Sequence, residues 1–254
     1  NSLDPIPGNA YDLDIDMVPT SGDDNTRWKF QMPNAVWGRR VDGTGAYTVN
    51  DVPMPDIGTM GRNTSPGCPT ASVRKMKVYR GTTEATNFKT YVNALTPGGN
   101  TYHDIGLLWG ARLMSPTGIF ADENATTIGG GEIQRHMVFM TDGETANDPI
   151  NYTPYGVEWW DRRRTPSGTA PTNLMLENAT DARTQALCKA IKNLGNTGVT
   201  LWVVYYGQAN SQTKTNMQNC ATDTAHFFEA KKTSDLIDTF NKIADSISEL
   251  KLTS

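Results

Sequence analysis

Two unbroken apolar runs in the second half of the chain constrain its fold more than any other feature. Residues 136–144, HMVFMTDGE, and residues 199–207, VTLWVVYYG, have the apolar, β-branched and aromatic content of buried strands. A shorter run at residues 225–230 is a third candidate strand, and helix-like segments separate the three. Because strands that alternate with helices form parallel sheets, the sequence predicts an α/β, doubly wound, mainly parallel sheet with helices on both faces.

Helical periodicity marks the segments around these runs. Apolar residues recur at helical spacing in residues 82–95, 104–114, 180–194, 212–220 and 234–250. We expect Thr180 or Asp181 to cap the third of these helices, and Gly195 to end it. Residues 71–79, ASVRKMKVY, are expected to form an additional strand at the start of the alternation.

Two long segments lack this periodicity. Residues 1–70 are rich in Pro, Gly, Asp and Asn, which predicts an irregular, turn-rich extension or insertion before a domain at residues 71–254. Residues 145–178 combine aromatic and basic residues with turn formers, and we interpret them as a long irregular insertion between two elements.

Composition excludes some functional classes. The chain has 254 residues, with 23 Lys and Arg against 27 Asp and Glu, and no long run of like charge. Electrostatic binding of nucleic acid is therefore not expected. No segment approaches the roughly 18 to 20 apolar residues that cross a bilayer. Since the chain begins with Asn1, we expect any targeting segment or membrane anchor to lie upstream.

Oxygen-bearing side chains occur where strands are expected to lead into loops and helices. Thr101 follows two glycines in GGNTYHDIGLLWG, and Asp142 ends the apolar run at residues 136–144. Ligands bind beyond the carboxyl ends of strands in open parallel sheets, and hydroxyl and carboxylate oxygens suit Mg²⁺, Mn²⁺ or Ca²⁺. The alternative is structural, because a threonine before a helix often caps it and Asp-Gly often forms a turn.

Enzymatic motifs are absent from the sequence. His103 has no nucleophile partner nearby in sequence, so we expect a structural or surface role for it rather than that of a general base. The chain contains neither G-x-S-x-G nor H-E-x-x-H. The segment PGGNT lacks the lysine and the spacing of a phosphate-binding loop.

Cysteines and aromatic residues give two further candidates. Cys188 and Cys220 fall on helices before and after the strand at 199–207, so a disulfide between them is feasible, although three free thiols are nearly as consistent with the sequence. In WWDRRRTP, the residue types are those enriched at protein contacts, although a solvated loop tip is an equal alternative. The candidate partner contacts there are Trp159, Trp160, Arg162 and Arg163.

Several linked motifs resemble one family. GGNTYHDIGLLWGARLMSPTG, HMVFMTDGE, ALCKAIKNLGNTGVTLWVVYYG and the C-terminal NCATDTAHFFEAKKTSDLIDTFNKIADSISELKLTS are similar to the C-terminal two thirds of a von Willebrand factor A domain. The particular resemblance is to TadG-like proteins of tight-adherence (Flp) pilus assembly, and it spans roughly residues 66–254. It implies that a first strand, a first helix and a D-x-S-x-S loop lie upstream, in a segment of the same precursor that remains associated.

The resemblance also implies a function. In the family, a divalent cation is held by the D-x-S-x-S loop, a threonine that falls on Thr101 and an aspartate that falls on Asp142, and a partner carboxylate completes the site. VDGTGAY offers Asp42 and Thr44, but Ala46 replaces the last hydroxyl, and we interpret this segment as a turn.

The implied protein is a non-enzymatic adhesion or pilus-assembly module of the bacterial envelope, periplasmic or surface-exposed. It would bind a protein partner through a divalent cation, most simply Mg²⁺, and reach a membrane only through an upstream anchor. The alternative is a single-metal hydrolase acting at the same sheet edge.

Overall fold

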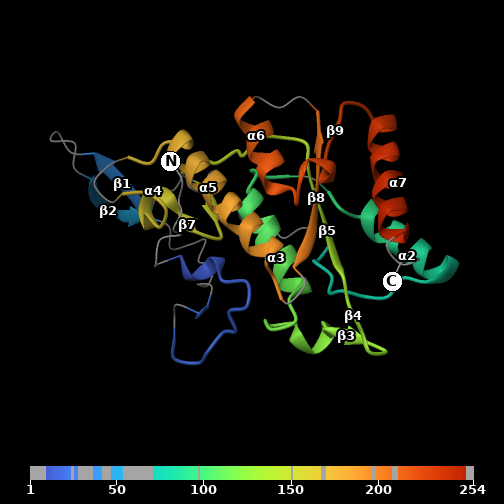
Figure 1. The fold of residues 1–254 in the computed structure, drawn as a ribbon. Helices are drawn as coiled ribbons and strands as arrows, with labels where there is room; N and C mark the ends of the chain where they lie inside the picture. The colour runs from blue at the N-terminus through green and yellow to red at the C-terminus, as the bar shows by residue number, and fades with distance from the viewer. Residues whose placement is uncertain are drawn as a thin grey trace. The chain divides into compact units, whose positions relative to one another are not determined.

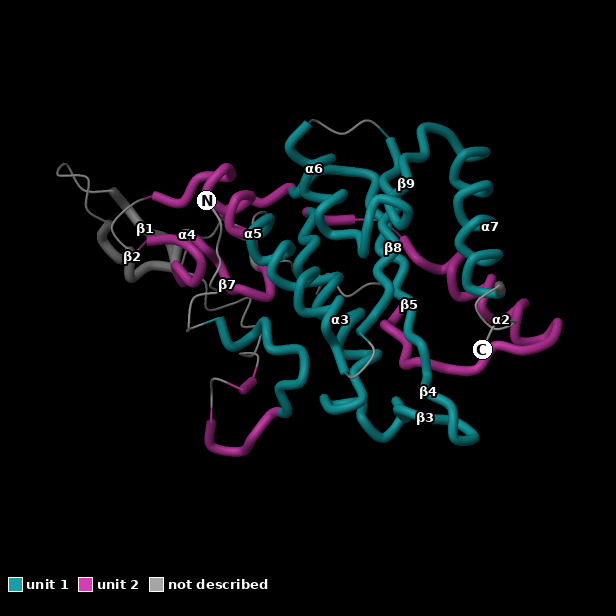
Figure 2. The backbone as a smooth tube through the Cα atoms, in the orientation of Figure 1, with its two compact units in different colours: residues 1–18, 101–145, 180–254 teal, residues 19–100, 146–179 magenta. Residues whose placement is uncertain are grey.

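The computed structural model groups the chain into two compact units, which Figure 2 distinguishes by colour. Unit 1 comprises residues 1–18, 101–145 and 180–254, and unit 2 comprises residues 19–100 and 146–179. The described residues are 10–23, 26–27, 37–41, 47–53, 71–96, 98–149, 151–166, 170–195, 198–207 and 211–249. The domain division at residue 70 stays a prediction, since residues 54–70 lie outside the described part of the chain.

Unit 1 is built on a parallel sheet of three strands in the order β5-β8-β9 (Figure 1). The strands are β5 (Arg135–Thr141), β8 (Val199–Tyr206) and β9 (Phe227–Ala230). Strand β8 is central and is buried along almost its whole length, as its apolar run predicts. The open parallel sheet confirms the α/β fold that the sequence predicts.

Helices pack on both faces of this sheet (Figure 1). The helices are α3 (His103–Met114), α5 (Asn173–Lys192), α6 (Ser211–Cys220) and α7 (Thr233–Glu249). Helix α7 covers the face of β8 that carries Trp202 and Val204, with Ile243 in the same core cluster. Because side chains alternate along a strand, Leu201 and Val203 of β8 point to the opposite face, where α3 and α6 contact the sheet.

The N-terminal segment of unit 1 is anchored on α3. A 3-10 helix, η1 (Tyr11–Leu13), leads into this segment, and Leu13 and Ile15 are buried. Arg112 of α3 donates hydrogen bonds to the carbonyl oxygens of Asp12, at 3.1 Å, and Asp14, at 3.0 Å. The segment is therefore part of the core of unit 1, although its sequence carries turn formers.

Strand β5 forms one edge of the described sheet. Its register with β8 places Val138 beside Trp202 and Met140 beside Val204, on the face that α7 covers further along the sheet. Val138 and Met140 are nevertheless 38% and 46% exposed. The described residues thus leave the apolar side chains on one face of β5 partly uncovered. Such exposed apolar residues on an edge strand are unusual in natural sheets.

Short elements connect the main ones of unit 1. These are η4 (Ala121–Glu123), the hairpin of β3 (Thr127–Ile128) with β4 (Gly131–Glu132), and η5 (Thr224–His226). None of the helices that the structure describes is long and apolar enough to span a membrane.

The described part of unit 2 contains two antiparallel pairs and two helices, together with residues 173–179 at the start of α5. The pairs are β1 (Trp37–Val41) with β2 (Tyr47–Pro53), and β6 (Tyr152–Thr153) with β7 (Gly156–Val157). The helices are α2 (Gly81–Asn93) and the single turn α4 (Glu158–Asp161). Gly156 has φ +80°, and a Cβ atom there would lie 2.1 Å from Asp161 Oδ2, so the turn between β6 and α4 requires glycine.

Two of the expected elements differ in the structure. Residues 71–79 form neither a helix nor a strand, and they pair with none of the described strands. The predicted cap of α5 is also wrong, because the helix begins at Asn173 and Thr172 Oγ1 accepts the backbone N–H of Met175. Thr180 and Asp181 lie inside the helix, whereas Gly195, with φ +67°, follows its last turn as expected.

Candidate functional site

Thr101 and Asp142 both lie in loops of unit 1. Thr101 is half-buried and comes two residues before α3, whereas Asp142 is exposed and directly follows β5. Asp142 also approaches the end of β8, because a Cβ atom at Gly207 would lie 3.7 Å from its carbonyl oxygen. The aspartate therefore occupies the carboxyl edge of the parallel sheet, as the sequence predicts.

A buried histidine connects the two loops. His103 is the first residue of α3, two positions after Thr101, and its side chain is 4% exposed. Its Nε2 atom lies 3.0 Å from the Oγ1 atom of Thr141, the residue before Asp142. Its Nδ1 atom lies 3.1 Å from Thr145 Oγ1, on the far side of the Asp142 turn. One imidazole therefore holds both ends of that turn.

The hydrogen bonds around His103 form a chain that continues into two helices. The Thr145 hydroxyl donates to Asp181 Oδ1 of α5 at 2.7 Å, and Asn216 Nδ2 of α6 donates to Asp181 Oδ2 at 2.9 Å. Since the single proton of Thr145 goes to Asp181, His103 donates to the Thr145 hydroxyl from Nδ1. The Thr141 hydroxyl, beside His103 Nε2, also lies within hydrogen-bond distance of Gly143 O, at 3.1 Å. The turn is thereby connected to α3, α5 and α6.

Burial sets the protonation state of this histidine. Desolvation lowers the pKa of His103 below its ordinary value. The negative charges of Asp181 and Asp104 and a hydrogen bond with the Gly143 backbone act to raise this pKa, but the effect of desolvation is larger. A neutral imidazole fits the chain of donors and acceptors. Because the ring is enclosed and both nitrogens are engaged, its role in this structure is structural, which was one of the two roles expected.

A second buried polar cluster lies beside the first. Asp104, fully buried in the first turn of α3, accepts from Arg183 Nε of α5 at 3.1 Å, and the same guanidinium pairs with the Asp12 carboxylate. The acidic side chain is also well placed at a helix N-terminus. The two clusters fix the start of α3 against both α5 and the N-terminal segment.

The donor chemistry at this edge suits a hard cation, but the described residues do not complete a site. Asp142 and Glu144 are exposed carboxylates, and both add to the effect of burial in raising the pKa of Tyr205. No three His, Cys, Asp or Glu residues in the described ranges cluster tightly enough to hold a metal ion. Asp42 and Thr44, considered for the D-x-S-x-S loop, lie outside those ranges.

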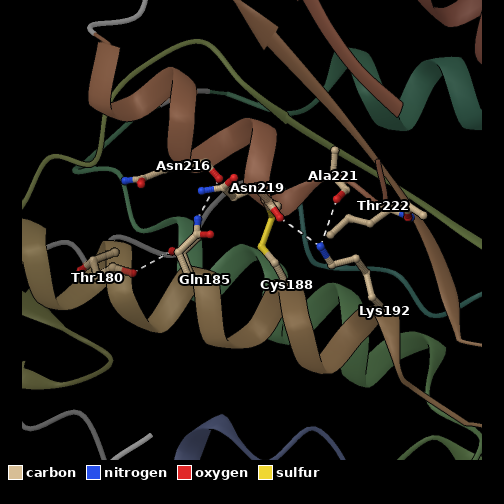
Figure 3. The surroundings of a disulfide bond; sticks show 11 residues. Thr180, Gln185, Cys188, Lys192, Asn216, Asn219, Ala221 and Thr222 are labelled. Atoms are coloured by element: carbon tan, nitrogen blue, oxygen red, sulfur yellow. Dashed lines mark hydrogen bonds between the residues drawn. A yellow bond between two sulfur atoms is a disulfide. The ribbon is translucent and has the colours of Figure 1, made fainter. Parts of the chain in front are cut away.

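The Cys188–Cys220 disulfide is present and connects α5 to α6 (Figure 3). Gln185 Nε2 donates to Asn216 O at 2.8 Å on one side of it, and Lys192 Nζ donates to Asn219 O and Ala221 O, both at 3.0 Å, on the other. Both cysteines are buried. The pairing confirms the disulfide candidate and excludes the alternative that these two are free thiols; Cys68 lies outside the described residues.

The candidate partner contacts surround α4 of unit 2. Trp159 and Trp160 lie within this turn, Arg162 follows it with φ +52°, and Arg163 is exposed. Their role as contacts stays a prediction. The side chain of Arg164, the next residue in sequence, is by contrast buried.

Arg164 is part of a small polar core. Its Nε donates to Glu158 Oε1 at 2.7 Å, and its guanidinium lies 4.1 Å from the ring centroid of Tyr155. The Arg164 and Glu158 side chains are 3% and 1% exposed. The basic run is therefore only in part a solvated loop tip.

Sequence reasoning missed the residues that organise this edge. His103 and Thr145 are far apart in the chain from each other and from the pair Asp181 and Arg183, and none belongs to a spaced motif. The one local signal was a histidine and an aspartate two and three positions after Thr101, at the start of an apolar helix. That pattern indicates that His103 and Asp104 are buried at the start of the helix, but it does not indicate which residues they contact.

Comparisons with known proteins give limited similarity. No protein-family model matches the chain, and no curated protein matches it. A solved structure that it resembles is the pilus adhesin SpaC from Lactobacillus rhamnosus GG in its open conformation, with 19% sequence identity and a TM-score of 0.39. The match covers 64% of this chain and 21% of that chain. At this TM-score the likeness establishes no shared fold, and we transfer no property of SpaC.

Proposed function

We propose that this chain is the larger part of a von Willebrand factor A domain resembling those of TadG-like pilus-assembly proteins. In this proposal it is a non-enzymatic adhesion or assembly module of the bacterial envelope that binds a protein partner through a divalent cation. The observation that carries the proposal is the hydrogen bond between His103 and Thr141. It ties the loop of Thr101 to the turn of Asp142 at the carboxyl edge of a parallel sheet, where such a site would form.

Thr101 and Asp142 would supply a hydroxyl and a carboxylate to the cation. The expected ion is Mg²⁺, with Ca²⁺ or Mn²⁺ as alternatives, because all three prefer hard oxygen ligands. Bound there, the cation would attract a carboxylate of the partner. The remaining protein ligands would come from the D-x-S-x-S loop of an upstream segment.

The open edge of β5 supports such a segment. No charged residue lies between Arg135 and Asp142 along this strand, although natural sheet edges usually carry charges, prolines or bulges that block pairing. Val138 and Met140 also remain exposed on one face. A further strand could pair with the edge of β5 that the described residues leave open and cover these side chains, and its end would reach the edge where Asp142 lies.

Removal of Asp142 tests the cation site. We expect Asp142→Ala to weaken Mg²⁺ binding by more than roughly 10- to 100-fold, which is the cost of losing a residue that only supports a metal ligand. Isothermal titration calorimetry, on the protein together with any co-purifying segment, measures this affinity. Asp122→Ala, which removes an exposed carboxylate of η4, is the matched control and should bind as the wild type does. Unchanged binding by Asp142→Ala would refute the assignment.

The hydrolase alternative makes a different prediction. A single-metal hydrolase would turn over members of a phosphoester panel, and that turnover would disappear with a chelator. An adhesion module should show Mg²⁺ binding without turnover. Chelator-sensitive turnover that Asp142→Ala abolishes would therefore favour the enzyme over the module.

A further inference from the structure

A pocket with a basic lining lies within unit 2 and uses none of the residues of the proposed cation site. Its volume is about 710 Å³. The lining residues are Arg74, Lys75, Met76, Lys77, Tyr79, Asn87 and Thr90. Residues 71–95 hold five basic side chains and one acidic one, in a chain whose net charge is −4. The local charge is thus opposite in sign to that of the whole protein.

Two tyrosines position Arg74 at this pocket. The Arg74 guanidinium lies 4.0 Å from the ring centroid of Tyr91, and its Nη1 atom lies 3.5 Å from the Tyr79 hydroxyl. The Tyr91 hydroxyl donates to Ser72 O at 2.9 Å, and the ring of Tyr79 meets that of Phe88 edge-on with centroids 5.0 Å apart. An aromatic frame that is itself fixed therefore orders the guanidinium, which reduces the entropy that a ligand would otherwise have to remove.

The positive charge of Arg74 is not neutralised by an ion pair. No carboxylate among the described residues lies within salt-bridge distance of it; the nearby Glu84 pairs instead with Lys77, at 2.9 Å. The hydrogen bond from Lys77 lowers the pKa of Glu84, and the charge of Arg74 contributes further. One lysine of the pocket thus already pairs with a carboxylate of its own chain, whereas no described carboxylate pairs with the ordered guanidinium of Arg74.

We propose that this pocket binds an acidic peptide segment, one carboxylate of which is held by Arg74. The planar guanidinium fork matches the two oxygens of a carboxylate. The Asn87 amide and the Thr90 hydroxyl, one helical turn apart on α2, add neutral hydrogen-bonding groups to the lining. Arg74, Lys75 and Lys77 all line the pocket within four consecutive positions of the chain. Several neighbouring cationic groups suit successive acidic side chains better than a single phosphate or sulfate.

Binding of a labelled acidic peptide tests this proposal. We would measure the fluorescence anisotropy of a fluorescein-labelled hexaglutamate peptide with the full chain, at low and at moderate salt. Arg74→Gln should weaken binding by about tenfold or more, because a charge-assisted, bidentate contact is lost. Arg74→Lys should restore only part of it, since an ammonium neither forks nor stacks in the same way.

Lys89→Gln provides the matched control. Lys89 is an exposed basic residue of α2 that does not line the pocket, so its loss removes the same charge and should change binding by less than about twofold. Equal losses in the two variants would mean diffuse electrostatic attraction and would overturn the proposal. The proposal would also be overturned if inorganic phosphate displaced the labelled peptide at the same concentration as unlabelled hexaglutamate does. That result would show a site for a small oxyanion instead. Circular dichroism of each variant reports whether the fold is retained.

Discussion

Single side chains at the carboxyl edge of the sheet act through hydrogen bonds more than through charge. His103 is the clearest case, because its enclosed neutral ring holds Thr141 and Thr145 on either side of the Asp142 turn. A similar set of local hydrogen bonds lies at the amino end of the sheet. There the Asp223 carboxylate accepts from Ala225 N at 2.8 Å and pairs with His226 Nδ1 at 2.7 Å. The carboxylate caps the short helix η5 just before β9.

This cap predicts a pH dependence of stability. The hydrogen bond from His226, and then that from the Ala225 N–H, hold the pKa of Asp223 below its ordinary value of 3.8. A depressed carboxyl pKa stabilises the fold above the unfolded value and loses that effect as the pH falls through the folded one. Asp223→Asn should therefore lower the unfolding free energy at pH 7, and progressively less as the pH falls below 3.8, in urea titrations at a series of pH values. A difference that persists in acid would contradict this origin.

Pairs of elements are held by covalent and polar contacts together. Helices α5 and α6 share the Cys188–Cys220 disulfide and the bonds of Gln185 and Lys192 on either side of it (Figure 3). The same helices carry Asp181 and Asn216, which are joined at 2.9 Å. Their mutual position therefore also sets where Thr145, and with it the Asp142 turn, is held.

Loss of the disulfide tests this connection between elements. The bridge spans 32 residues of sequence, so the chain-entropy model predicts that Cys188→Ala with Cys220→Ala costs about 3 to 4 kcal/mol of unfolding free energy. Urea titration of the double variant, beside wild type under oxidising and reducing conditions, measures that cost. A change below about 1 kcal/mol would show that the polar contacts hold the two helices without the bridge.

At the scale of the whole molecule, the open edge of β5 is the feature that the proposed function explains. Val138 is 38% exposed, so Val138→Lys should change the stability of this chain by no more than about 0.5 kcal/mol. The same change should prevent association of a segment that pairs with β5, because it would bury a lysine. Native mass spectrometry, with sequencing of any co-purifying peptide, measures that association.

Ile128→Lys, at a residue of the β3–β4 hairpin that is 77% exposed, is the control and should leave association intact. If the wild-type protein shows the mass of this chain alone under native conditions, no segment occupies the edge. The cation site would then lack the ligands that the proposal takes from upstream.

Most element types of unit 1 could be predicted from the sequence. Continuous apolar runs and four-residue apolar spacings reflect burial, which the chain encodes locally, so β5, β8, α3, α6 and α7 were predictable. The sequence also placed Asp142 directly after a buried strand and made the Cys188–Cys220 pair feasible. Local patterns failed at residues 71–79, because whether an extended segment becomes a strand depends on a neighbour that pairs with it.

Tertiary structure alone decided the rest. Whether His103 is a ligand, a base or a structural residue depends on Thr141, Thr145 and their neighbours, which are distant in sequence and meet it only after folding. The burial of Arg164 within a basic run depends in the same way on Glu158 and Tyr155. Hydrogen-bond partners and desolvation are properties of the folded arrangement, and a pattern of residue types records neither.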